Sequence, residues 1–210
     1  MRCVVSIGAL VLASGAVHAA PEGPVPMGPG SSIFWTSAFD GNTDNFRETL
    51  LVQGDDFAIF QSEADWSEGD ATDYFALFSG IYFNTCNLEM PTSEERQALA
   101  ALWPLTEGAT VEIATDEGAT FSVGQSTEFY LMGEPRAAHS IDIAYKGEEP
   151  SEETILVLDD MPLTVSVNWD DGSRDSVTLV TRPKVDPLPE LNTDLIGTCA
   201  ALLDAKTEQN

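Results

Sequence analysis

The side chains that most often perform catalysis are scarce in this sequence. Two histidines are present, and the second, His139, stands beside Ser140 at the start of a predicted strand. The chain has no HExxH motif, no GxSxG nucleophile motif, no phosphate-binding glycine loop and no dinucleotide fingerprint. We therefore interpret His139 as a structural or surface histidine. With 35 aspartates and glutamates, a hydrolase that uses two carboxylates stays an alternative, but no pair stands out as catalytic.

Oxygen-bearing side chains alternate in one acidic segment. Asp40, Asn42 and Asp44 are spaced like the first ligands of a calcium-binding EF-hand loop. The glycine at the sixth position and the glutamate at the twelfth are missing, so the segment is not an EF-hand. A calcium site at these three residues is a hypothesis, and an ordinary turn is its alternative. No other cofactor is indicated.

Three aromatic residues lie near Asp and Asn side chains, namely Trp35, Trp66 and Tyr74. Exposed aromatic rings in such surroundings can stack on sugars, which makes these three residues a candidate ligand site. The alternative is that they pack in the core, as most large aromatic residues do.

Residues 1–19 have the features of a secretory signal peptide. Arg2 precedes an apolar run that is shorter than a membrane span, and Val17-His18-Ala19 fits the small-residue cleavage rule. No other stretch has the ~20 apolar residues that a spanning helix needs. We expect a soluble periplasmic or secreted protein. Residues 20–32, rich in Pro and Gly, are expected to be a flexible lead-in, and residues 33–206 a single domain.

Export would change both the number of cysteines in the mature chain and their expected oxidation state. Cys3 would be removed with the signal peptide, which leaves Cys86 and Cys199. In an oxidising compartment, two cysteines in one domain predict a disulfide. The alternative, a free or metal-binding pair, lacks further His or Cys residues nearby.

The composition is strongly acidic, with a formal net charge of −26. Nucleic acids and anionic membrane surfaces would be repelled, so nucleic-acid binding is excluded. The charge is either a solvated coat, as expected in a salty environment, or an attraction for cations and basic partners. An unknown envelope or extracellular partner is expected.

Several short elements would position these groups. Thr92 and Glu95 form a predicted capping box for a helix that ends before Pro104, and Trp103 is expected to pack on the sheet. A C-terminal helix, capped at Thr193, places Cys199 on its apolar face. Strands are expected at 46–52, 57–62, 74–85, 110–114, 119–123, 128–132, 140–145, 154–158, 164–169 and 175–181. Residues 74–85 are apolar on both faces, which predicts one strand in the middle of a sheet.

These elements predict a mainly β domain, an antiparallel sandwich or a barrel-like sheet, with one short central helix, a C-terminal helix and one disulfide.

The segment Leu102-Trp103-Pro104-Leu105, followed by Gly108 and Val111, resembles a group of uncharacterised exported bacterial proteins. These β-rich proteins carry an LWPLxxGxxV segment, and the resemblance extends over about residues 46–114. It implies no activity.

The preferred function is a non-catalytic binding or accessory module of the cell envelope. The alternative is a carboxylate-dependent hydrolase acting on envelope or extracellular polymers. A deep cleft with facing carboxylates would favour the hydrolase, and a smooth or grooved surface would favour the module.

Overall fold

The computed structural model describes residues 27–63, 74–115, 118–147, 150–181, 191 and 196–207. These residues form one antiparallel sheet of eleven strands, in the order β5-β4-β3-β2-β1-β11-β10-β9-β8-β7-β6. The strands are β1 (Ser32–Phe39), β2 (Asn42–Gln53), β3 (Phe57–Ser62), β4 (Tyr74–Phe78), β5 (Tyr82–Thr85), β6 (Thr110–Ile113), β7 (Ala119–Leu131), β8 (Glu134–Tyr145), β9 (Glu152–Leu158), β10 (Thr164–Trp169) and β11 (Arg174–Val180). The predicted mainly β, antiparallel fold is confirmed, in its barrel-like form.

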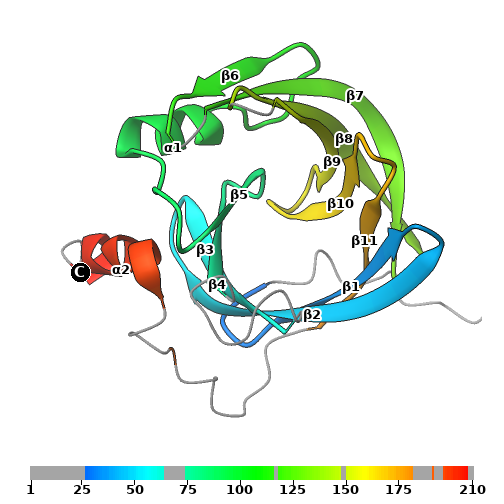
Figure 1. Cartoon of the computed structure of the whole chain (residues 1–210), viewed down its shortest axis with the longest axis horizontal. Coiled ribbons are helices and arrows are strands. Elements are labelled where there is room, and N and C mark those ends of the chain that lie inside the picture. The colour runs from blue at the N-terminus through cyan, green and yellow to red at the C-terminus, as the bar shows by residue number, and fades with distance from the viewer. Residues whose placement is uncertain are drawn as a thin grey trace, which may run out of the picture.

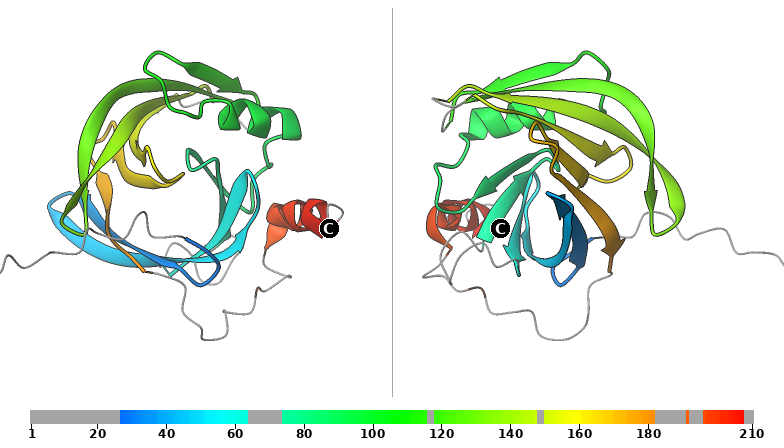
Figure 2. Two further views of the ribbon diagram at one scale, coloured as in Figure 1. Left: turned by 180° about the vertical axis from the view of Figure 1, so that it is seen from behind. Right: turned by 45° about the vertical axis from the view of Figure 1, so that its right-hand side comes forward.

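The sheet is rolled (Figure 1), and the first and last strands of the chain, β1 and β11, pair with each other in its middle. β1 lies between β2 and β11, and hairpins continue in both directions from this centre. The two ends of the sheet, β5 and β6, do not pair with each other. The helix α1 (Ser93–Ala100) connects them along the chain and contacts both β6 and β4, next to β5 (Figure 2).

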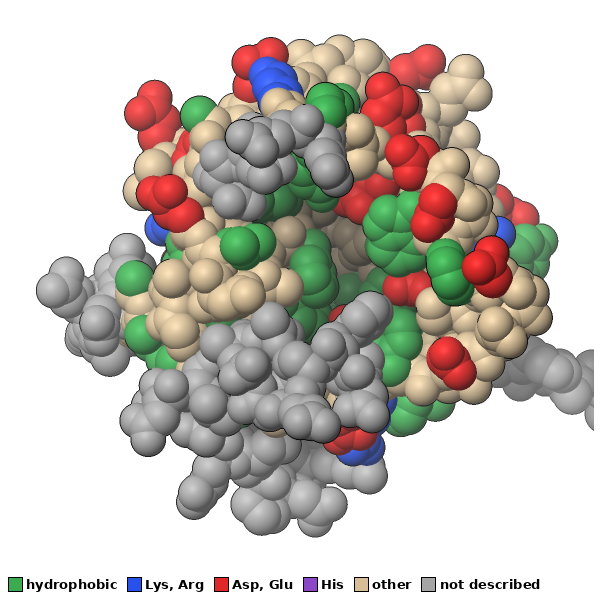
Figure 3. Space-filling model, viewed as in Figure 1, with side chains coloured by type: hydrophobic (Ala, Val, Ile, Leu, Met, Phe, Trp, Pro, Cys, Tyr) green, Lys and Arg blue, Asp and Glu red, His purple; other side chains and the backbone are tan. Residues whose placement is uncertain are grey.

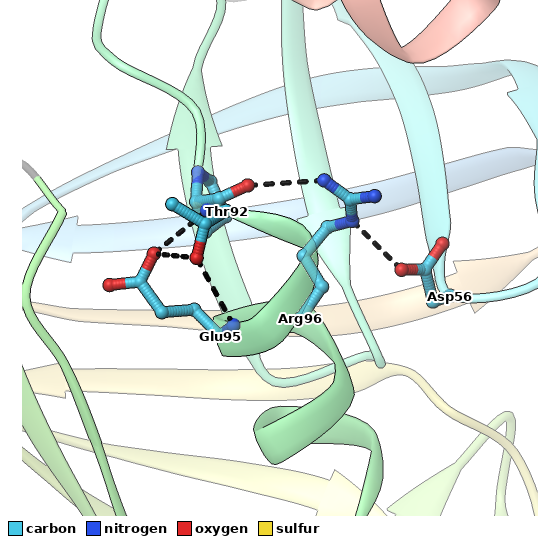
Figure 4. A network of polar contacts seen from close by, with 5 residues as sticks. Asp56, Thr92, Glu95 and Arg96 are labelled. Carbon is cyan, nitrogen blue, oxygen red and sulfur yellow. Dashed lines mark hydrogen bonds and ion pairs between the residues drawn. The ribbon is translucent and has the colours of Figure 1, made fainter. Parts of the chain in front are cut away.

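The capping box of α1 is present as predicted, and its glutamate also binds the backbone just beyond β6. The Thr92 hydroxyl accepts a hydrogen bond from the Glu95 amide, and the Glu95 carboxylate accepts one from the Thr92 amide (Figure 4). The same carboxylate accepts from the amides of Ala114 and Thr115, just beyond β6, at 2.6 and 2.8 Å. Burial opposes the ionisation of Glu95, but hydrogen bonds from the Thr115 and Thr92 hydroxyls, together with those from the Thr92 and Ala114 amides, outweigh it and lower its pKa to about 2.

A second side chain of α1 reaches the other part of the sheet. Arg96 pairs with Asp56, in the turn between β2 and β3, at 2.8 Å, and donates to the Pro91 carbonyl at 3.1 Å (Figure 4). Neighbouring residues of one helix thus hold the end of β6 and the β2–β3 turn. In this way α1 covers the seam that the strands leave open.

The predicted disulfide between Cys86 and Cys199 is present, with Cα atoms 5.1 Å apart. It joins the end of β5 to a 3₁₀ turn (Gly197–Cys199) that leads into the helix α2 (Ala200–Thr207). The Thr198 hydroxyl donates to the carbonyls of Cys86 and Leu88 at 2.8 and 2.6 Å. The C-terminal segment is thereby fixed on the outside of β3 and β4 (Figure 2).

The strands β3 and β4 are covered on both faces. Their outer residues, such as Ile59 and Ala76, pack with Cys86, Cys199 and Leu202. Their inner residues, such as Phe60 and Phe75, belong to a second apolar cluster inside the roll. The unbroken apolar sequence of β4, in which all five residues are buried, follows from this double coverage.

Three predicted boundaries are wrong. Residues 74–85 form a hairpin rather than one central strand, because Ser79 and Gly80 turn the chain with φ of 51° and 73°, and its strands lie at one end of the sheet. Segments 119–123 and 128–132 are one strand, β7, whose register shifts between Val123 and Ser126. The C-terminal α-helix begins at Ala200, after a 3₁₀ turn.

Two further points of the sequence analysis concern Thr193 and strand β1. Thr193, the predicted cap of the C-terminal helix, lies outside the described residues. Strand β1 was not predicted at all, and it joins the two halves of the sheet by pairing with both β2 and β11.

One end of the interior is closed by a contact between two turns. Thr164 donates to the Gly80 carbonyl at 2.9 Å, which ties the β9–β10 turn to the β4–β5 turn. A Cβ atom on Gly80 would lie 2.1 Å from the carbonyl carbon of Pro162. Gly80 is therefore required both for its positive φ and for this close approach.

Candidate ligand-binding cavity

The rolled sheet encloses a cavity of about 480 Å³. Figure 3 shows the molecule hollowed over this interior, with hydrophobic and acidic side chains at its edge. The wall is formed by residues of nine strands and of the β4–β5 and β9–β10 turns: Ile33, Trp35, Phe46, Glu48, Phe60, Ser62, Phe75, Leu77, Ile81, Phe83, Thr85, Tyr145, Glu153, Ile155, Leu163, Thr164, Val167, Trp169 and Asp175. A volume of this size suits a small organic molecule.

Aromatic rings form much of this wall. Trp35 stacks on Phe46 with ring centres 5.9 Å apart. Phe75 stacks on both Phe60 and Phe83, at 5.2 and 4.1 Å. Phe83 is 48 % exposed although it lines the cavity, which places it at the opening.

A buried glutamate interrupts the apolar wall on β2. Glu48 is 6 % exposed, and its carboxyl accepts a hydrogen bond of 2.7 Å from the indole of Trp35. Burial raises the pKa of Glu48 most strongly, the hydrogen bond from Trp35 lowers it and the charge of Asp175 raises it, and together they bring the pKa to about 8. Glu48 is therefore mostly protonated at neutral pH.

A second buried carboxyl group lies two strands away. Asp175 on β11 is opposite Ser37 of β1, and β1 separates it from the strand of Glu48. Asp175 is 6 % exposed, and its Oδ1 atom has no hydrogen-bond partner among the described residues. Burial raises the pKa of Asp175, opposed by a hydrogen bond from Ser37.

A third carboxyl group belongs to a less buried part of the wall. Glu153 on β9 accepts a hydrogen bond of 2.7 Å from the Tyr145 hydroxyl and another from Trp169. Burial raises the pKa of Glu153, and these hydrogen bonds partly offset it. Trp169 is 36 % exposed, so this group lies nearer to solvent than Glu48 does.

The aromatic residues that the sequence singled out are not brought together. Trp35 lines the cavity, whereas Tyr74 precedes the inward-facing Phe75 on β4 and so points to the opposite face. Both are buried, at 7 % and 3 % exposure, and neither presents a ring to the outer surface. Trp66 lies outside the described residues.

The predicted calcium ligands lie in the β1–β2 hairpin. Asp40 and Gly41 form its turn, with φ of 48° and 77°, and Asn42 and Asp44 belong to β2. Within the described ranges, no three His, Cys, Asp or Glu residues are placed to hold a metal ion. His139, for its part, pairs with Asp159 at 2.7 Å, away from the cavity.

The polar cavity residues escaped the sequence analysis, although the strands contain a signal for them. Phe46, Glu48 and Leu50 alternate along β2, so a glutamate occupies a position whose neighbours on the same face are apolar. Asp175 stands in the same relation to Val177 on β11. An acidic residue at an inward position is costly unless it has a function or a partner.

The arrangement defines an antiparallel, rolled-sheet protein with an aromatic interior cavity that contains carboxyl groups. No family model matches the chain, and no curated protein matches it. Among solved structures, the hypothetical lipoprotein YmcC from Escherichia coli (K12) aligns with a TM-score of 0.45 and 13 % identity, over 74 % of this chain and 88 % of that chain. A likeness of this degree says nothing about function.

In the part of the chain that the structure describes, no helix is long and apolar enough to cross a membrane.

Proposed function

We propose that this protein is an exported, non-catalytic binding protein that holds a small, largely apolar molecule in the cavity of its rolled sheet. The observation that carries the proposal is the cavity itself: about 480 Å³, walled mainly by aromatic and aliphatic side chains, with few polar groups. Such cavities gain binding free energy from apolar burial and orient the ligand through a few polar contacts.

Export is supported by the disulfide between Cys86 and Cys199 and by the predicted signal peptide at residues 1–19. Disulfides persist in oxidising compartments such as the periplasm. A site in the cell envelope, with a partner or ligand found there, follows from the same reasoning.

Binding can be tested with Nile red, a neutral apolar dye whose fluorescence rises in apolar surroundings. We expect saturable binding at one site. Val167→Trp, which fills the cavity from β10, should abolish it, whereas Leu179→Trp, at a partly exposed position on β11 outside the cavity lining, should not. Equal binding by both variants would contradict the proposal.

A second candidate function is favoured by one observation. Glu48, a carboxyl that stays protonated near neutral pH, lies near a second carboxyl, Asp175. This resembles the division between acid and base in carboxylate-dependent hydrolases. Turnover of an envelope polymer that is lost in both Glu48→Gln and Asp175→Asn would support a hydrolase. We prefer binding, because the apolar wall offers a polymer of sugars few hydrogen-bonding partners.

A further inference from the structure

All the acidic or basic side chains that line the cavity are carboxyl groups. Glu48, Glu153 and Asp175 are its ionisable carboxyl groups, and no Lys, Arg or His is among the described lining residues. An anionic ligand, such as a fatty acid, would find no cationic side chain here, and any ionised carboxylate would repel it. The polar end of the ligand is therefore neutral or positively charged.

Asp175 provides the second observation. Its Oδ1 atom is buried without a hydrogen-bond donor among the described residues, in a side chain that is only 6 % exposed and lines the cavity. A buried acceptor without a donor is destabilising. A hydrogen-bond donor on the ligand would remove this cost, and a charged donor would do so most strongly.

Glu48 extends the acceptor site toward β2. Its carboxyl accepts a hydrogen bond from the neutral indole of Trp35, and a positively charged donor beside it would favour its ionised form. Glu48 lies opposite Ile33 and Asp175 lies opposite Ser37, so the two carboxyl groups are on either side of Trp35 along β1. All three side chains line the same cavity.

The surroundings of this pair suit an organic cation better than a metal ion. The stacked rings of Trp35 and Phe46 line the same cavity, and the faces of aromatic rings attract ammonium groups. A metal ion would need more ligands, and no group of three suitable side chains occurs in the described ranges. The net charge of −26 also draws cations toward the protein.

We propose that the ligand carries a protonated amine, which donates hydrogen bonds to Asp175 and Glu48, while its apolar body packs on the aromatic wall. This inference rests on the proposed binding function and adds the chemical class of the ligand, an amphipathic amine.

Displacement of Nile red tests the two claims separately. The competitors are dodecylamine, dodecanol and dodecanoate at pH 7, which share a twelve-carbon chain and differ in the head group. We expect dodecylamine to displace the dye at a concentration ~10-fold or more below dodecanol, because a hydrogen bond to a charged group is stronger than a neutral one. Dodecanoate should be the weakest competitor.

Substitutions of the carboxyl groups test which of them cause the preference for the amine. Asp175→Asn should reduce the ratio of amine to alcohol affinity ~10-fold, and Glu48→Gln should reduce it in the same direction. Glu134→Gln, at an exposed position at the start of β8, should leave the ratio unchanged. Thermal melting of each variant confirms that it is folded.

The outcomes are distinct. Equal displacement by amine and alcohol, with Nile red bound, would overturn the amine inference and leave the binding function standing. A preference for the amine that persists in both cavity variants would also overturn it. Failure of Nile red to bind would remove the binding function, and the amine inference with it.

Discussion

The strongest quantitative consequence of the structure concerns the buried carboxyl of Glu48. Its pKa is about 8 in the folded protein, against an ordinary value of 4.5. Between these two values the unfolded chain releases this proton while the folded protein retains it, so stability falls as the pH rises. Each pH unit in this window costs about 1.4 kcal/mol, and the whole window costs about 5 kcal/mol.

Glu48→Gln removes the ionisable group and keeps the shape of the side chain. At pH 4.5 the free energies of unfolding of variant and wild type should differ little. The variant should be more stable by about 3 kcal/mol at pH 7 and by about 5 kcal/mol at pH 9. Urea unfolding, followed by tryptophan fluorescence at the three pH values, measures this difference.

The exposed Glu134 provides the control, because Glu134→Gln removes a carboxyl from a position outside the cavity. Its difference from wild type should stay within ~0.5 kcal/mol at all three pH values. If the difference between Glu48→Gln and wild type is the same at pH 4.5 and pH 9, the carboxyl ionises as it would in water and the reasoning about the cavity is wrong.

Three further predictions concern the frame around the cavity. Gly80→Ala should destabilise the protein by about 2 to 3 kcal/mol in urea unfolding, because it adds backbone strain and a clash with the β9–β10 turn. Reduction of the disulfide Cys86–Cys199, which closes a loop spanning 113 residues, should lower the free energy of unfolding by about 4 to 5 kcal/mol. Glu95→Gln should cost about 1 to 2 kcal/mol at pH 7, because the pKa of Glu95 is lowered to about 2 and the carboxylate is partly exposed. This last difference should diminish as the pH falls from 4.5 toward 2.

Each of these has a control or a contradicting result. Gly133→Ala has the same positive φ but no atom within 4 Å of the added Cβ, so it should cost less than Gly80→Ala. Equal losses would show that the contact with the β9–β10 turn adds nothing. Unchanged stability in reducing buffer would contradict the role given to the disulfide. A cost for Glu95→Gln that is as large at pH 2 as at pH 7 would contradict the charge-based account.

The sequence predicted the helix start and the disulfide better than it predicted the residues of the cavity. Thr92 with Glu95 signalled a helix start through local hydrogen bonding, and the two cysteines beyond the predicted signal peptide left one pairing. These features depend on a few residues or on simple counting. The strand at Ser32–Phe39 was missed although a local signal exists, because Asp40-Gly41 is a typical two-residue hairpin turn and joins it to β2. Its second partner, β11, lies about 140 residues away, and no local pattern predicts that pairing.

The cavity could not be predicted for a related reason. Glu48 stood out only as one acidic residue among 35, and the significance of its place between Phe46 and Leu50 depends on knowing that this face of β2 points inward. The convergence of Glu48 and Asp175 depends on β2 and β11 flanking the same strand. Alternation gives the face of each residue, but only the closed topology gives its neighbours.

The pairing of β1 with β11 also constrains when the protein can fold. The first strand to be synthesised has one neighbour that follows at once and another that is nearly the last strand made. Until that late strand arrives, the interior stays open and β1 keeps an unsatisfied edge. A chain with such distant partners folds slowly, and slow folding is compatible with the export proposed above, because a chain must not yet be compact when it is threaded across a membrane.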